Sequence, residues 1–150
     1  NSMNYKQDTL LTYDMSDRQR FLGIICSSIN ELTQSENALN EAISLILPYY
    51  KTDKETLEPA IISDYVLLGN LYYKLLKDND KAKKSYYQAM SYYDNVFKKD
   101  KENSIRDYKQ AVESLLSILA YDEDMKDKKE IERLKDINTK LRKLVLDEQE

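Results

Sequence analysis

The stretch DYVLLGNLYYKLLKDNDKAKKSYYQAMSYY, residues 64–93, decides the fold that the sequence predicts. On a helix, the apolar side chains of its first half share one face, and Gly69 leaves room for a second helix to approach closely. This glycine costs roughly 1 kcal/mol of helix stability against alanine, which indicates a packing requirement. The face consists of Tyr65, Leu68, Tyr72 and Leu75.

A polar turn and a second apolar stripe complete this segment. Lys77-Asp78-Asn79-Asp80 predicts a turn, with Asp80 as the N-cap of the next helix. Two helices joined by a short polar loop form an αα-hairpin. The second stripe, which places small residues opposite the glycine, consists of Ala82, Tyr86, Ala89 and Tyr93.

The order Tyr65-x2-Leu68-Gly69-x2-Tyr72, followed by Ala82-x3-Tyr86 and Ala89, resembles the tetratricopeptide repeat signature over about residues 62–95. The resemblance implies an all-α fold in which three antiparallel hairpins stack as a short right-handed array. Aligning the hairpins at an offset of 43 residues places Cys26 and Val112 at the position of Gly69, an offset that also fits HEAT-like units.

The resemblance also implies a binding groove, lined by the first helix of each repeat. The partner-binding positions carried onto the middle repeat are Ser63, Val66, Leu67, Asn70, Tyr73 and Lys74. Asn70 matches an asparagine that holds a ligand's backbone or C-terminal carboxylate, whereas the lysine expected one turn earlier is Val66. An apolar groove with Leu67 and Tyr73 favours a strand or helix of another protein. The equivalent positions of the fifth helix are Lys109, Gln110 and Glu113.

The remaining chain divides into an arm, residues 1–15, and a helical domain, residues 16–150. Residues 1–3 resemble a cloning scar, so we expect one domain of a longer protein. Hairpins are predicted at about 16–48, 58–97 and 104–147. The expected apolar face of the first helix, which starts at Ser16, consists of Phe21, Leu22, Ile25, Ile29 and Leu32.

Cap and breaker residues place the other helix ends. Ser35 is expected to cap the second helix, and Pro48 to end it. Pro59 is expected in the first turn of the third helix. The fourth helix could extend through 96–97, and Ser104 can cap the fifth.

Composition limits the function classes. The 150 residues are 41% hydrophobic and 33% charged, with two glycines and two prolines, which favours one all-α domain with long helices. A net charge of −4 counts against nucleic acid as a partner. No uninterrupted apolar run is long enough to predict direct membrane insertion. Cys26 is expected to be a buried small hydrophobe.

The sequence lacks the residues of common active sites. It contains no histidine and one cysteine, and neither glycine belongs to a phosphate-binding motif. The acidic segment 122–127 lacks the spacing of a calcium-binding loop, so a solvated turn is favoured. We therefore expect no catalytic, cofactor-binding or metal-binding residues. A hydrolase that uses carboxylates alone is the remote alternative.

The leading hypothesis is a non-catalytic module that binds, and thereby stabilises or scaffolds, a partner protein. The alternative is an oligomerisation domain that self-associates through Ile131, Leu134, Leu141 and Val145 of the last helix, a heptad-like stripe with Asn138 as its polar position; packing on the fifth helix is favoured. The thirteen tyrosines could form binding hot spots or fill gaps between helices. The abundant Lys, Asn, Ile and Tyr resemble the composition of an AT-rich bacterium, which favours the periplasm or cell envelope.

Overall fold

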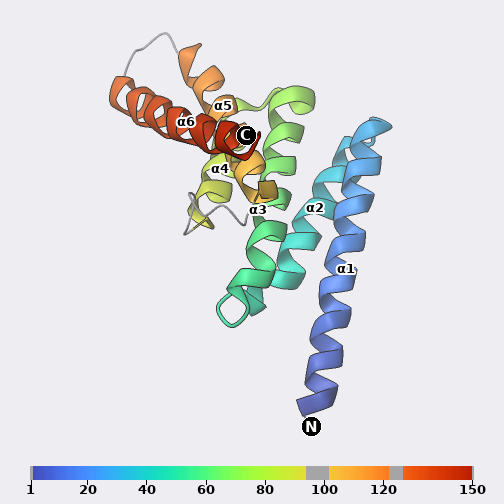
Figure 1. The fold of residues 1–150 in the computed structure, drawn as a ribbon. Coiled ribbons are helices and arrows are strands. Elements are labelled where there is room, and N and C mark those ends of the chain that lie inside the picture. Colours follow the sequence, from blue (N-terminus) through green and yellow to red (C-terminus); the bar gives the residue numbers. More distant parts are fainter. Residues whose placement is uncertain (1, 94–101, 122–126, 150) are drawn as a thin grey trace.

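The computed structural model describes residues 2–93, 102–121 and 127–149, and in these residues the protein is all-α, with six α-helices and no strand (Figure 1). The predicted all-α class is thus confirmed. A 3-10 turn, Leu47–Tyr49, follows the second helix, and a π-helical segment, Leu71–Leu76, continues the third. The helices are α1 (Ser2–Ser28), α2 (Leu32–Ile46), α3 (Lys54–Asn70), α4 (Asn79–Ser91), α5 (Glu102–Ala120) and α6 (Lys128–Gln149).

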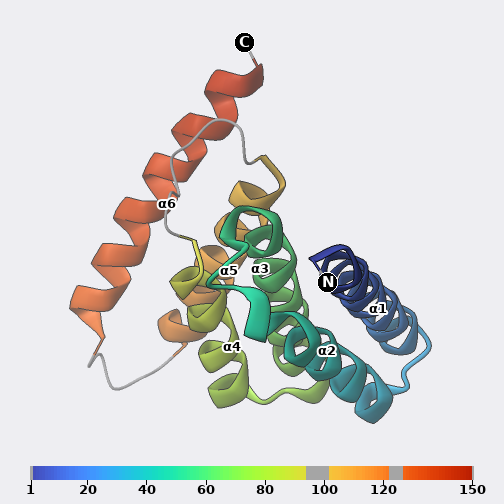
Figure 2. The ribbon, with the colours of Figure 1, turned by 90° about the horizontal axis from the view of Figure 1, so that it is seen from below.

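Neighbouring helices in the chain pack against each other. α1 packs on α2, α3 on α4 and α5 on α6, while α2 also contacts α3, and α5 contacts both α3 and α4. α1 lies at one edge of the molecule in both views, and α6 runs across the direction of α1, α2 and α3 (Figures 1 and 2). Among the described helices, none is long and apolar enough to cross a membrane.

The α3–α4 hairpin confirms the expected close approach at Gly69. A Cβ added there would lie 2.5 Å from Cε1 of Tyr86, whose side chain is fully buried. The turn between the two helices differs from the prediction. Lys77 takes the left-handed conformation, with φ 56°, and Asp78 rather than Asp80 caps α4. The Asp78 carboxylate accepts a 3.1 Å hydrogen bond from the backbone N–H of Lys81.

The first hairpin differs from the prediction at both ends of its first helix. α1 begins at Ser2, so the predicted start at Ser16 is wrong and the residues of the predicted arm are helical. The turn centres on Asn30, with φ 65°, and α2 already begins at Leu32. Ser35 is therefore not a cap. Its hydroxyl lies inside α2 and donates a 2.7 Å hydrogen bond to the carbonyl oxygen of Gly23.

The predicted apolar face of the first helix is also wrong, because most of it points to solvent. Phe21 is 63% exposed, Ile25 56% and Ile29 64%. α1 instead buries its small residues Ser16, Gly23 and Cys26 against α2. Small side chains allow the two backbones to approach, and Ser16 Oγ donates to the carbonyl oxygen of Ala42 at 2.7 Å.

Gly23, rather than Cys26, occupies the close-approach position of the first hairpin. A Cβ at Gly23 would lie 2.7 Å from Cγ of Leu39, as a Cβ at Gly69 would meet Tyr86. The dipeptide Leu22-Gly23 thus corresponds to Leu68-Gly69, and the offset of 43 residues does not align these contacts.

Other helix ends also lie at different residues from those predicted. Pro59 lies inside α3, beyond the first turn where it was expected. α2 ends at Ile46, and Pro48 stands in the following 3-10 turn. α5 includes Ser104, which is therefore not its cap. α4 ends at Ser91, so the predicted extension of this helix is wrong, and residues 96–97 themselves lie outside the described residues.

α6 packs on α5, as the sequence favoured. Leu134 and Leu141 are fully buried in the core of their own chain, and Ile131 and Val145 pack against that core. The apolar stripe of α6 therefore packs against other helices of its own chain. Tyr87 of α4 donates a 3.0 Å hydrogen bond to Glu130 and so links α6 to the α3–α4 hairpin.

Several tyrosines fill the gaps between neighbouring elements. The Tyr13 ring of α1 meets Tyr49 edge to face at 5.8 Å, and its hydroxyl donates to Asp53 at 2.9 Å. Tyr92, which follows α4, stacks on Tyr65 of α3 at 5.7 Å. These rings link elements that are distant in sequence, which is the gap-filling role considered for them.

Candidate partner-binding groove

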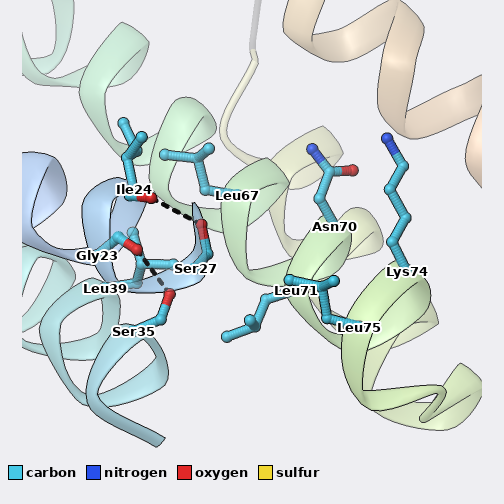
Figure 3. Close-up of a pocket in the computed structure, with 10 residues that line it drawn as sticks. All are labelled: Gly23, Ile24, Ser27, Ser35, Leu39, Leu67, Asn70, Leu71, Lys74 and Leu75. Atoms are coloured by element: carbon cyan, nitrogen blue, oxygen red, sulfur yellow. Dashed lines mark hydrogen bonds between the residues drawn. The ribbon is translucent and has the colours of Figure 1, made fainter. Parts of the chain in front are cut away.

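A cavity of about 280 Å³ opens between α1, α2, α3 and the π-helical segment (Figure 3). Its walls are mostly aliphatic. The lining residues are Gly23, Ile24, Ser27, Ser35, Leu39, Leu67, Asn70, Leu71, Lys74 and Leu75. Because α1 and α2 supply half of them, the cavity joins the first hairpin to the second.

The structure brings three of the six predicted groove residues together here, namely Leu67, Asn70 and Lys74. They project from successive turns along one edge of the cavity (Figure 3). Val66 is only 2% exposed and belongs to the core, so its prediction as a contact residue is wrong for this surface. Tyr73 packs against the core, outside the lining of this cavity.

The sixth predicted residue, Ser63, lies at a different hollow. That hollow has a volume of about 510 Å³ and is polar, with Arg20, Arg106 and Asp107 among its lining residues. The predicted set is thus divided between two surfaces, because Ser63 lies two turns before Asn70 on a helix that other elements cross.

Asn70 is held in place by contacts from two other helices. Its Oδ1 atom accepts hydrogen bonds from Tyr86 Oη of α4 at 2.7 Å and from Gln110 Nε2 of α5 at 3.1 Å. Burial raises the pKa of Tyr86, and its phenol O–H is the donor in the bond to Asn70. Because both donors use the amide oxygen, the amide nitrogen is left as the side-chain group that can bind a ligand.

Two donors stand at the same edge of an otherwise apolar cavity. Neither the amide nitrogen of Asn70 nor the ammonium group of Lys74 has a hydrogen-bond partner among the described residues. The two serines are already bonded, since Ser27 donates to the carbonyl of Ile24 at 2.8 Å and Ser35 to that of Gly23. The arrangement can therefore hold apolar side chains together with an acceptor such as a carbonyl or carboxylate oxygen.

The α1 and α2 walls of the groove were missed by sequence reasoning. Leu22-Gly23 was the available signal, because it repeats the Leu-Gly pair of the middle hairpin. Ile24 was also overlooked, since apolar periodicity directs attention to the side of α1 that the fold exposes.

The wall formed by α1 is held against α3 by a buried ion pair. Arg20 Nε donates to Asp64 Oδ1, and Arg20 Nη2 lies 3.3 Å from Asp64 Oδ2. Asp64 is fully buried, and this burial raises its pKa to about 6, although the hydrogen bond and charge of Arg20 lower it. Asp17 also pairs with Arg20, at 2.7 Å.

The described residues contain no group of three or more His, Cys, Asp or Glu side chains arranged to hold a metal ion. The groove itself offers no carboxylate or thiol among its lining residues.

Comparison of the chain with family models, curated proteins and solved structures gives no match.

Proposed function

We propose that this protein is a non-catalytic, tetratricopeptide-like interaction module that binds a segment of a partner protein in the groove between α1, α2 and α3. The observation that carries the proposal is the cavity itself, in which Leu67, Asn70 and Lys74 line one edge. The hairpins would stack as the resemblance implies, and binding would stabilise or scaffold the partner.

The side chains that line the groove indicate which chemical groups its ligand would carry. Leu39, Leu67 and Leu71 provide an apolar floor for one or two aliphatic or aromatic side chains. Asn70 and Lys74 would bind a carbonyl or carboxylate that follows these side chains in the ligand. A short strand or helix of another protein meets both requirements.

A peptide experiment tests this function with matched variants. Peptides are selected from a random phage-displayed library on the full chain, and their affinity is measured by fluorescence anisotropy. Leu75→Asp places a charge in the groove, and Leu47→Asp makes the same change at a leucine outside it. The two leucines are similarly exposed, at 44% and 38%, so their effects on solubility and folding are comparable.

We expect Leu75→Asp to weaken binding at least about tenfold, because a charge at an apolar contact remains desolvated and unpaired. Leu47→Asp should bind as the wild type does. Chemical-shift changes on peptide binding should cluster at Ser27, Leu39 and Asn70. Equal loss in both leucine variants, or shift changes confined to another surface, would contradict the proposed groove.

A further inference from the structure

The outward side of α1 carries an apolar stripe that no other described element covers. Leu10, Leu11, Phe21, Leu22 and Ile25 are between 47% and 66% exposed. α1 is about 40 Å long by its helical rise and lies at the edge of the molecule (Figure 2). This surface is separate from the groove, which uses the side of α1 that faces α2 and α3.

The stripe has the spacing of a coiled-coil seam. The exposed residues that form its centre are Gln7, Leu11, Asp14, Arg18, Phe21 and Ile25. Successive members are four and three residues apart, which is the a and d pattern that keeps one side of a helix towards a partner helix. Asp14 and Arg18 stand in the middle, with apolar Leu11 before them and apolar Phe21 and Ile25 after them, while Gln7 is a polar residue at one end.

The four central residues of the seam, Leu11, Asp14, Arg18 and Phe21, are complementary to the same residues of a second copy that runs in the opposite direction. When two copies of α1 lie antiparallel, with Leu11 opposite the second copy's Phe21, Arg18 stands opposite the second copy's Asp14. Ile25 then stands opposite the second copy's Gln7. The two-fold axis repeats each contact, so two apolar layers flank two ion pairs. Asp14 and Arg18 are 64% and 80% exposed and 3.8 Å apart within one chain, so both are accessible to a second copy.

We propose that α1 is a homodimerisation surface, on which a second copy of this chain packs its own α1 in antiparallel orientation, with the Asp14–Arg18 pairs setting the register. A buried polar pair in a coiled coil disfavours shifted registers, because a shift leaves charges opposite apolar side chains. The proposed surface for self-association is therefore on α1, and not on α6 as the sequence predicted, because the apolar stripe of α6 is buried.

Charge reversal tests the surface and its register together. Sedimentation velocity is measured over a concentration series for the wild type, Asp14→Arg, Arg18→Asp and an equimolar mixture of the two variants. Each variant alone would place four like charges at the centre of its dimer. We expect each to raise the dimer dissociation constant at least about tenfold, and the mixture to restore dimers at the wild-type level. Lys135→Asp, an exposed charge reversal on α6, is the control and should leave the constant unchanged.

The proposal is overturned by a wild type that stays monomeric throughout, by single variants that dimerise as the wild type does, or by a mixture that fails to restore the dimer. Circular dichroism checks that the variants keep their helices. Should either lose them, Asp14→Cys/Arg18→Cys in a Cys26→Ser background decides the question. A covalent dimer under oxidising conditions supports the register, and its absence contradicts it.

Discussion

Tyr86 shows how one side chain organises several elements. Its ring covers Gly69, where any Cβ would clash, and its hydroxyl reaches Asn70 at 2.7 Å. The same residue therefore sets the distance between α3 and α4 and orients the amide at the edge of the groove. A change at Gly69 should thus affect both packing and binding.

Gly69→Ala should destabilise the protein by about 1–2 kcal/mol, because overpacking against Tyr86 exceeds the gain in helix propensity. Urea denaturation of the wild type, Gly69→Ala, Tyr86→Leu and the double variant measures the coupling. With Tyr86→Leu in place, Gly69→Ala should become neutral or stabilising. If Gly69→Ala stabilises the chain that retains Tyr86, the ring does not restrict this position.

Helix periodicity alone does not show which of the predicted groove residues line the cavity. The helices that pack around α3 decide this. Leu67, Asn70 and Lys74 were identified from the resemblance alone, and they meet at one edge. Val66 was misplaced because α3 is covered on more than one side, so a position expected to face a ligand faces the core.

At the scale of elements, α6 shows how a heptad-like stripe can serve a packing role within one chain. Its leucines are buried, and between them lies Asn138, which is 9% exposed. The amide oxygen of Asn138 is buried with no hydrogen-bond partner among the described residues. An unsatisfied buried polar atom costs stability, so an apolar side chain of similar size should stabilise this position.

Asn138→Leu should raise the free energy of unfolding by about 1–2 kcal/mol, since it replaces an unsatisfied amide by an apolar side chain of similar size. Chemical denaturation measures the change. Asn37→Leu, at an exposed position of α2, provides the control and should alter stability by less than about 0.5 kcal/mol. A loss of stability in Asn138→Leu would show that the amide is bonded in solution.

α1 is the element whose orientation the sequence predicted least well. Apolar periodicity assigns Phe21, Ile25 and Ile29 to the core, yet the structure exposes them. Ser16 and Gly23 are buried instead, because hydrogen bonds to the backbone and a close helix contact compensate for the loss of apolar burial there.

At the scale of the whole molecule, the Arg20–Asp64 pair joins the first hairpin to the second, and Arg20 lines the polar hollow rather than the groove. The pKa of Asp64 is raised to about 6 from an ordinary 3.8, chiefly by burial. A carboxyl group whose pKa is higher in the folded state contributes most stability when it is protonated in both states.

The contribution of Asp64 to stability should therefore be largest below about pH 4 and should fall as the pH rises to about 6. Thermal unfolding of the wild type and Asp64→Asn across this range measures it. The difference in unfolding free energy should change by about 1–3 kcal/mol, with the wild type losing stability relative to the variant as pH increases. Asp136→Asn, on an exposed face of α6, should show no such trend. A flat difference for Asp64→Asn, or one of opposite sign, would contradict the raised pKa.

The sequence by itself determined the all-α class, the α3–α4 hairpin and the close contact at Gly69, because helix propensity, a polar turn and a glycine among large residues are local signals. Only the tertiary structure decided which side of α1 is buried, that Ser63 and Asn70 lie at different hollows, and that α6 uses its stripe within the chain. Those outcomes depend on the shape and bonding groups of the element opposite. The sequence of a helix gives the pattern of its own side chains, but it does not show which surface of another element the helix will pack against.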